Sequence, residues 1–393
     1  MESGEEQGPI GTPAEPAGAR RGRLWARWLP PFGLATLIVA TAPFLGVLQA
    51  WVRLSFGLGY LSWVSAGLAV AGLAALAWAI LRIREHRALR YGALAVAAGL
   101  VGLQVVSWSA GGREADVLER VHLLEYGLLA ILFARAFRER HESRLLAVPV
   151  LLAVALASVA DELVQWLTPV RVGDGRDVLL NLWAGAIGLL FGLALSGPRG
   201  LFRPAAAATR RLAAVLGTVA VLAGALFFDI AHLGYEVHDP QAGVFLSGHS
   251  PEALARAAAD RARRWPVEGV PVDRPVALED RFRSEAGWHV NARNHAVTIG
   301  DLPLAWRENR ILERWYGPFV DLPGNHWPSP QKEAIREELR ASRPEVLAPS
   351  PRYRSPTLQG RIVPGPPRIL LWIGAAALAV GLGWPARRRG GQA

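Results

Sequence analysis

Residues 158–181 read SVADELVQWLTPVRVGDGRDVLLN, a polar stretch that joins two long apolar segments. It places Asp161, Glu162, Gln165, Arg171 and Asp177 at the adjoining ends of those segments. Ionisable residues are costly to keep at a membrane boundary, and by default they indicate a functional site. The sequence around the stretch decides whether the two segments are membrane helices.

The apolar residues of the chain occur in blocks rather than as an even scatter. Hydrophobic residues make up 51% of the 393 residues. A helix needs about 17–25 mainly apolar residues to cross a bilayer. Eight blocks reach about that length, at 32–52, 61–81, 91–109, 121–137, 145–163, 178–196, 212–228 and 369–384. The predicted fold is therefore all-α, a polytopic transmembrane bundle of about eight spans.

Arginines gather at alternate ends of these blocks. They lie before the first block, after the second, fourth and sixth, and at the C-terminus. Together these segments hold 19 basic and 7 acidic residues. Such an asymmetry is the positive-inside pattern, which predicts cytoplasmic termini and a multi-pass protein of the bacterial cytoplasmic (inner) membrane. Because topology accounts for the net charge of +10, the expected partner is the lipid bilayer, and no nucleic acid is predicted.

A polar region of 139 residues, 229–367, interrupts the apolar blocks with 18 basic and 18 acidic residues. The charge pattern places it outside the cytoplasm as a small, mainly helical domain. Apolar spacing predicts helices at 251–265, 304–319 and 331–342, short strands near 275–282 and 295–299, and a Pro-rich tether at 344–367. The remaining predicted parts are a disordered N-terminus (1–30), the main bundle (31–200), a cytoplasmic linker with the seventh helix (201–228), and the eighth helix with a basic tail (368–393).

The chain contains no cysteine, which excludes disulfides and thiolate metal sites. Six of its nine histidines lie in the 229–367 region. None of these six is paired at a spacing typical of metal ligands, such as His-x3-His. The sequence therefore predicts neither a metal site nor a cofactor.

Three helix ends carry polar residues on shared faces. Glu119, His122 and Tyr126 are spaced i, i+3 and i+7 at the start of the fourth block. Asp161 and Gln165 share a face at the end of the fifth. At the start of the sixth, Asp177, Asn181 and Gly185 are spaced by four. The predicted topology brings all three ends to the extracytoplasmic side, with Arg171 in the connecting turn.

These residue types suit work on an anionic substrate. Arg171 is suited to a bidentate grip on a phosphate. His122 can act as general acid or base, with its tautomer held by Glu119 or Asp161. The adjacent carboxylates of Asp161 and Glu162 repel each other, so that one can hold and donate a proton. Gln165 and Asn181 would orient the substrate or other side chains. Close helix packing is the role predicted for Gly185, Gly188 and Gly192.

The same residues also fit a purely structural role. A satisfied network of carboxylates, Arg171 and His122 would join helix ends and fix the register of the bundle. Spacing alone leaves this structural role, ligand binding or transport, and catalysis open. Proton-coupled transport is the least favoured, because it needs carboxylates deeper in the bilayer and the first three blocks contain none.

In these motifs the sequence resembles the VanZ-like family. The family pattern is a His followed four residues later by Tyr, then Asp-Glu-x-x-Gln, a Pro-x-Arg turn, and Asp-x-x-x-Asn before a Gly-rich helix. The matching residues are His122, Tyr126, Asp161, Glu162, Gln165, Pro169, Arg171, Asp177, Asn181 and Gly185. The resemblance covers roughly residues 30–200, and Val170 and Asp174 stand where the family often has Gly and Ser.

The resemblance implies an integral membrane role in the bacterial cell envelope, since the family is named for a protein linked to teicoplanin resistance. The leading hypothesis is a protein that binds or modifies a lipid-linked anionic substrate, such as a polyprenyl-phosphate glycan, at its outer face. His122, Asp161 and Glu162 would be the acid–base groups. Arg171, Asp177, Gln165, Asn181, Glu119 and Tyr126 would bind the substrate. The alternative is a non-catalytic assembly partner of envelope machinery that docks through residues 229–367.

Overall fold

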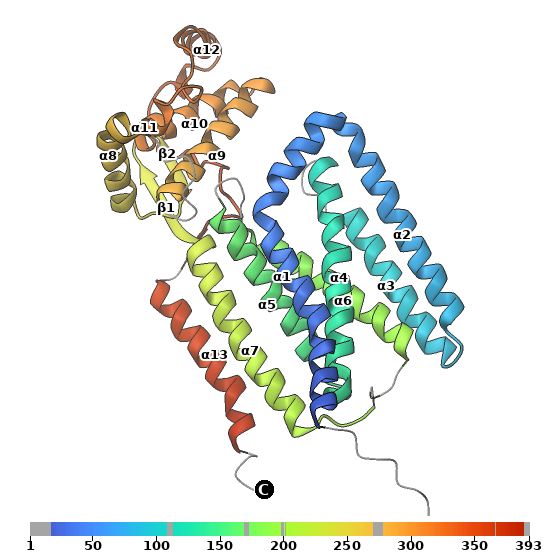
Figure 1. Cartoon of the computed structure of the whole chain (residues 1–393). Helices are drawn as coiled ribbons and strands as arrows, with labels where there is room; N and C mark the ends of the chain where they lie inside the picture. The colour runs from blue at the N-terminus through green and yellow to red at the C-terminus, as the bar shows by residue number, and fades with distance from the viewer. Residues whose placement is uncertain are drawn as a thin grey trace, which may run out of the picture.

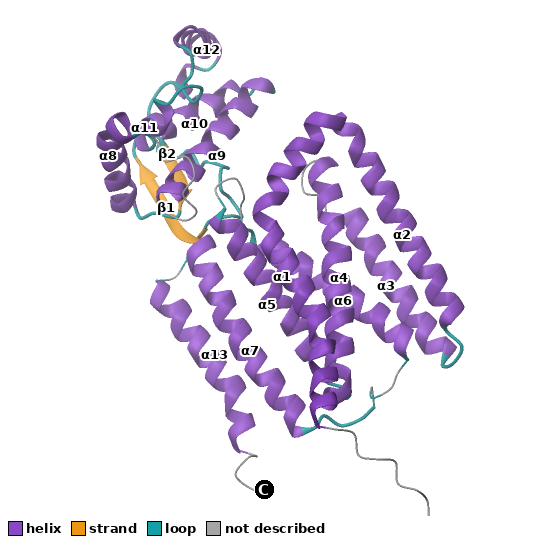
Figure 2. Cartoon of the chain, in the orientation of Figure 1, coloured by secondary structure: helices purple, strands orange, loops and turns teal. Residues whose placement is uncertain are grey.

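The computed structural model describes residues 17–107, 113–168, 173–197, 200, 202–269, 278–365 and 367–388. Two parts are visible in Figure 1, a bundle of long helices and a smaller domain at one end of it. Helices form most of both parts, and the few strands all belong to the smaller domain (Figure 2).

Each of the eight apolar blocks corresponds to one long helix of the bundle, to within one or two residues at its ends; residues 108 and 109 of the third block lie outside the described residues. These helices are α1 (Ala17–Phe56), α2 (Tyr60–Arg82), α3 (Arg87–Ser107), α4 (Arg113–His141), α5 (Ala147–Leu167), α6 (Gly175–Ser196), α7 (Ala207–Phe227) and α13 (Arg368–Arg388). The first two form a hairpin that turns at a single 3-10 turn, Gly57–Gly59 (Figure 1).

Several of these helices can cross a membrane by length and composition. Among the described residues, five helical stretches qualify, namely Trp25–Arg82, Arg87–Ser107, Ala147–Leu167, Gly175–Ser196 and Ala207–His232. Two helices do not meet the requirements of length and composition. Helix α4 contains too many charged residues, and the apolar part of α13, Arg368–Gly383, is too short. The protein is therefore a membrane protein, and the count of eight spans stays a prediction.

The first helix begins earlier than its apolar block. Residues 17–30, predicted to be disordered, are the first turns of α1. Alanine, leucine and arginine are strong helix formers, so the helix extends from the apolar block into the basic flank. Pro30, Pro31 and Pro43 lie inside this helix, where neighbouring helices of a bundle can compensate for the missing hydrogen bonds. Residues 1–16 lie outside the described part of the chain.

The core of the bundle lies where α4 packs against α5 and α6. Tyr126, Leu129, Val150 and Ala184 are fully buried there. At the crossing of α4 and α6, a Cβ added to Gly188 would lie 2.1 Å from the carbonyl oxygen of Gly127. Only glycine allows this approach, because any side chain would collide with backbone. Gly185 and Gly192 pack against side chains instead, with an added Cβ 2.9 Å from Val154 and 3.3 Å from Ile131. All three glycines therefore have the packing role predicted for them.

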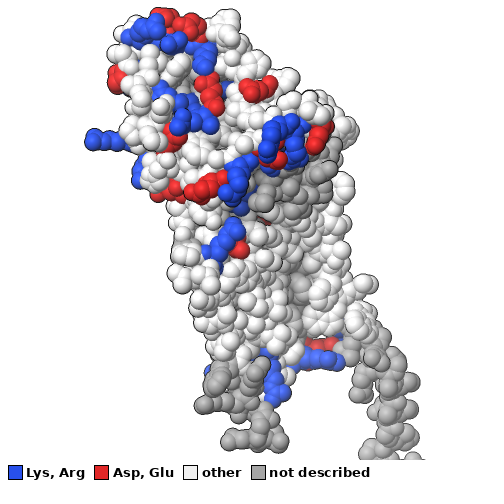
Figure 3. Space-filling model, turned by 90° about the vertical axis from the view of Figure 1, so that its left-hand side faces the viewer, with Lys and Arg blue, Asp and Glu red and all other residues white. Residues whose placement is uncertain are grey.

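The outer surface of the bundle is apolar. Many large apolar side chains of the bundle are exposed, among them Trp63 (81%) and Val106 (86%). Single exposed hydrophobic residues are normal on a protein surface, but so many together indicate a contact surface. Figure 3 shows a broad, mainly uncharged belt between the charged smaller domain and a basic lower end. This distribution of charge is typical of a surface that faces lipid.

The arginine-rich segments lie at one end of the bundle. The start of α1, the turn between α2 and α3, the end of α4, the start of α7 and the end of α13 all lie away from the smaller domain (Figure 1). The polar ends of α4, α5 and α6 lie at the other end, next to that domain. The positive-inside pattern and the polar site are therefore at opposite ends of one bundle.

The smaller domain is built on a three-stranded sheet in the order β2-β1-β3. Strand β1 (Leu233–Asp239) follows α7 after a π-helical turn, Phe228–His232, and pairs antiparallel with β2 (Gly243–Ser247). Strand β3 (Val363–Pro364) pairs parallel with β1 and leads to α13. The Pro-rich segment before β3 therefore packs into the domain. The helices of the domain are α8 (Pro251–Glu268), α9 (Leu278–Thr298), α10 (Leu302–Trp315), α11 (Gly317–Val320) and α12 (Ser329–Ser342).

The three helices predicted in this region are present, but the two predicted strands are wrong. Residues 278–282 and 295–298 belong to α9, whereas 275–277 lie outside the described residues. Both predictions came from runs of four to eight residues, a length at which apolar patterns do not separate strand from buried helix. Strand β2, in which almost every residue is buried, lacks the alternation that marks a half-buried strand.

A buried polar network joins the helices of the smaller domain. The side chain of Glu308 on α10 is fully buried, and its Oε2 lies 2.6 Å from Nδ1 of His289 on α9. The hydroxyl groups of Ser355 and Thr357 donate to the same carboxylate at 2.7 and 2.9 Å, and that of Tyr353 donates as well. Burial alone would raise the pKa of Glu308, but His289 and these hydroxyls outweigh it and hold that pKa below its usual value.

We expect Glu308→Gln to destabilise the domain by about 3 kcal/mol at pH 7, since it removes a buried charge that lies against His289 and accepts from three hydroxyl groups. A carboxylate with a lowered folded-state pKa stabilises the fold above its unfolded pKa of about 4.3, and this contribution is lost as the pH falls through the folded value. The difference in melting temperature between wild type and variant should therefore shrink below about pH 4. The control is Glu337→Gln, which removes only the exposed pair with Arg340. An equal difference at pH 7 and pH 3.5 would contradict the stabilising role of the charge.

Candidate functional site

The centre of the polar site is the carboxylate of Asp161 on α5. It is almost completely buried. The hydroxyl of Tyr126 on α4 donates to its Oδ2 at 2.9 Å, and the amide of Gln165 donates to the same atom at 3.2 Å. Tyr126 is itself fully buried and stacks at 6.0 Å on the ring of His122. Three of the residues predicted from spacing are therefore in direct contact across two helices.

Glu162 lies beside Asp161 and is fully buried. Its Oε1 accepts a hydrogen bond from Gln165 at 3.4 Å, and its Oε2 accepts one from the backbone N–H of Asp174 at 2.9 Å. Among the described residues, no arginine, lysine or histidine forms an ion pair with Glu162. Its partners are neutral donors, which compensate only partly for the loss of water around a charge.

Residues 173 and 174, directly before α6, bring the Asp174 N–H to Glu162. A Cβ added to Gly173 would lie 2.4 Å from the carbonyl oxygen of Glu162, so this approach requires glycine. Asp174 then caps α6 by accepting from the backbone N–H of Arg176 at 2.9 Å. The glycine and the capping aspartate together fix the turn over the buried carboxylates. Arg171, predicted to contact the substrate from this turn, lies with Pro169 and Val170 outside the described residues.

One turn deeper, Asn181 of α6 is fully buried and donates to the hydroxyl of Ser158 on α5 at 2.9 Å. Within the part of the chain that the structure describes, the Asn181 amide oxygen has no hydrogen-bond partner. Buried polar atoms normally have one. The site therefore offers an acceptor at its base in addition to the carboxylates above it.

The rim of the site is formed by α4 and the start of α6. The guanidinium of Arg176 donates two hydrogen bonds to the carboxylate of Glu119, at 2.5 and 3.4 Å. Glu119 or Asp161 was expected to hold the tautomer of His122, and this stays a prediction; the contact seen for the Glu119 carboxylate is with Arg176. The Nδ1 of His122 lies 3.6 Å from Glu125. Asp177 lies within electrostatic reach of Glu119 and Glu162, so the rim and the buried pair form one acidic cluster.

Contacts from the smaller domain complete the turn. Gly175 N–H donates to Nε2 of His232, at the end of α7, at 2.8 Å. Because Nε2 is an acceptor, Nδ1 carries the proton and donates to the carbonyl oxygen of Arg361 at 2.8 Å. The guanidinium of Arg361 lies 3.6 Å from Asp174 and 4.3 Å from the ring centre of Trp288 on α9.

Sequence reasoning missed four of these residues. Glu125 is spaced three from His122 and Arg176 precedes Asp177, so helical spacing and adjacency were signals that could have found both. His232 lies 57 residues from its partner Gly175 in the sequence. Arg361 lies 129 residues from its partner His232. No local pattern predicts such contacts.

The arrangement is suited to proton transfer. Within the described residues, no group of three His, Asp or Glu side chains is placed to hold a metal ion. Carboxylates in a dry site beside a tyrosine hydroxyl and an imidazole are the usual parts of general acid–base chemistry. The guanidinium of Arg176 at the rim is of a kind suited to a phosphate or carboxylate group.

A comparison with protein families identifies part of this bundle. Residues 93–196 match the family model described as VanZ/LLP1. These residues form a VanZ-like domain. The match confirms the resemblance expected from the motifs and covers a narrower segment than residues 30–200. No curated protein and no solved structure was found to match the chain.

The VanZ-like domain contains every predicted site residue, from Glu119 to Asn181. It runs from α3 to α6. Helices α1, α2, α7 and α13 and the smaller domain lie outside the match. His232 and Arg361 therefore contact the turn of the VanZ-like domain from outside it.

We expect His232→Phe to loosen the turn at Asp174 and Gly175. Phenylalanine keeps the ring beside Phe227 and Phe228, but it leaves the Gly175 N–H and the Arg361 carbonyl without partners, at a cost of about 1–3 kcal/mol each. Hydrogen exchange measured by mass spectrometry should show faster exchange in peptides that cover residues 173–178. His238→Phe, at an exposed position, is the control. Unchanged protection in the His232 variant would show that the contact does not hold the turn.

Proposed function

We propose that the VanZ-like domain binds a lipid-linked anionic substrate of the bacterial cell envelope, of the polyprenyl-phosphate type, and modifies it. The observation that carries the proposal is the burial of Glu162 and Asp161 with hydrogen-bond partners that are mostly neutral. A purely structural network would be served as well by uncharged side chains, without the cost of burying charge. Charges kept in a membrane bundle at that cost indicate function.

The topology behind this proposal is an eight-span protein of the cytoplasmic membrane with both termini in the cytoplasm. Residues 229–367 then form an extracytoplasmic domain. The separation of the arginine-rich ends from the polar site supports this orientation. The site would open toward the outer leaflet, beneath the smaller domain, where lipid-linked envelope precursors present their phosphates.

In the proposed complex the anion lies at the rim and the reacting group lies deeper. Arg171 binds the phosphate, and Arg176 provides a second guanidinium beside it. An anion in this position favours the protonated form of the nearby carboxyl groups, because like charges repel. A protonated Asp161 or Glu162 can then donate to the substrate, with His122 as the partner base. Tyr126, Gln165, Asn181, Glu119 and Asp177 hold the substrate or these groups in place.

A non-catalytic role is the second candidate, favoured by the contacts of the smaller domain with the turn. His232 and Arg361 join that domain to residues 174 and 175. In this role, the domain docks an envelope protein partner, and the bundle serves as its membrane anchor.

The test uses a deletion strain that carries wild-type or variant genes. Asp161→Asn, Glu162→Gln and His122→Gln nearly keep shape and remove the acid–base function. General acid–base groups typically contribute 10²–10⁴-fold in rate, so we expect each variant to leave the lipid-linked glycan pool as altered as the deletion does. Mass spectrometry of extracted lipids measures the pool. Glu85→Gln, on the exposed turn between α2 and α3, is the control and should restore it.

Restoration of the wild-type pool by all three variants, with normal insertion of each, would rule out the catalytic proposal. If in addition the deletion of residues 240–360 removes a co-purified partner, the docking role is favoured.

A further inference from the structure

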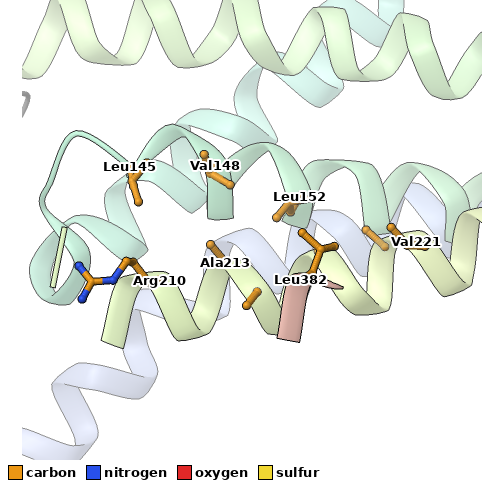
Figure 4. Close-up of a pocket in the computed structure, with 10 residues that line it drawn as sticks. Leu145, Val148, Leu152, Arg210, Ala213, Val221 and Leu382 are labelled. Atoms are coloured by element: carbon orange, nitrogen blue, oxygen red, sulfur yellow. The ribbon is translucent and has the colours of Figure 1, made fainter. Parts of the chain in front are cut away.

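A second feature lies on the opposite half of the bundle from the site. A groove of about 570 Å³ runs between α5 and α7, with Leu382 of α13 beside it (Figure 4). Ala213 and Ala214 of α7 have side chains too small to fill the space toward Val148 and Leu152 of α5. At Gly217 the groove narrows, because an added Cβ would lie 3.3 Å from Leu382 and 3.8 Å from Leu152. Apart from Arg210 at one end, the lining is apolar. None of these residues belongs to the candidate functional site.

The length of the groove matches one leaflet of a bilayer. On α7 its lining runs from Arg210 to Val221, which at 1.5 Å per residue is about 16 Å. Half of a hydrocarbon core of about 30 Å is about 15 Å. The groove therefore begins at the basic end of the bundle and reaches the depth at which the chains of one leaflet end.

The mouth of the groove carries positive charge without compensation. Arg210 is exposed, and its guanidinium donates to the carbonyl oxygen of Ala205 at 2.5 Å. In the described part of the chain, no carboxylate lies within ion-pair distance of Arg210, Arg211 or Arg144. The nearby Glu142 lies 3.6 Å from Arg203. Arginine is well suited to phosphate, and basic residues at the membrane surface attract anionic headgroups.

We propose that this groove binds an anionic phospholipid of the leaflet at the basic end of the bundle. One acyl chain lies along Ala213, Ala214 and Gly217, and Arg210 binds the headgroup phosphate. Arg144 and Arg211 add attraction for a net negative headgroup and repel the ammonium group of a zwitterionic one such as phosphatidylcholine, which distinguishes an anionic lipid from a zwitterionic one. The lipid fills the space between α5, α7 and α13, the helix that follows the smaller domain. This binding site is independent of the proposed function at the other end.

Native mass spectrometry of the full-length protein tests the proposal, with phosphatidylglycerol and phosphatidylcholine of identical acyl chains. We expect the wild type to retain one phosphatidylglycerol in preference to phosphatidylcholine. Each basic residue at an anionic surface contributes about fivefold in affinity, so Arg210→Ala should weaken phosphatidylglycerol binding about fivefold. Ala214→Leu fills the groove and should weaken the binding of both lipids.

The matched control is Arg84→Ala, an exposed arginine at the same end of the bundle but on the turn after α2. It should leave binding unchanged. Equal retention of the two lipids by the wild type would overturn the proposal. The proposal would also be overturned if Arg210→Ala weakened phosphatidylglycerol binding no more than Arg84→Ala does. Binding of inorganic phosphate as tight as that of the lipid would overturn it too. So would a dimer that Ala214→Leu abolishes while lipid binding is unaffected.

Discussion

The burial of two adjacent carboxylates inside an apolar helix bundle is the constraint on which the rest of this structure depends. Asp161 and Glu162 lose nearly all contact with water, and an isolated charge in such a place is highly unfavourable. They are retained because Tyr126, Gln165 and the Asp174 backbone supply donors at hydrogen-bond distance. Each donor comes from a different place in the chain, so the carboxylates specify how α4, α5 and the turn before α6 meet.

That requirement explains features that look unrelated in the sequence. The Asp174 N–H reaches Glu162 only because Gly173 has no side chain, and α4 approaches α6 closely only because Gly127 and Gly188 have none. The turn is held from the other side by His232 and Arg361. The smaller domain is therefore joined to the VanZ-like domain at the position that determines the environment of Glu162. A change in the domain would be transmitted to the site through two hydrogen bonds and one ion pair.

The sequence predicted the parts of this arrangement that arise from local pattern. Apolar blocks located the helices of the bundle, since the length needed to cross a bilayer leaves few alternatives. Helical spacing and the family resemblance grouped Tyr126 with Asp161 and Gln165, and the structure brings these three together. Spacing did not show which acidic side chain pairs with which basic one, because a long side chain such as Arg176 can reach any of several carboxylates. His232 and Arg361, and the pairing of β3 with β1, depend on contacts between distant segments. Strands β1 and β2 are neighbours in the sequence, but runs this short do not reliably separate strand from buried helix.

The central claim is that the carboxylate site and the smaller domain lie on the outer side of the membrane, opposite to the arginine-rich ends. The natural absence of cysteine allows a direct measurement with single cysteines at two exposed positions, Glu337→Cys on α12 and Arg84→Cys at the turn after α2. Intact cells are treated with a membrane-impermeant maleimide, and opened membranes serve as the reference. The account predicts that intact cells are labelled at position 337 and not at position 84, whereas opened membranes are labelled at both. Labelling of intact cells at position 84 and not at 337 would contradict it.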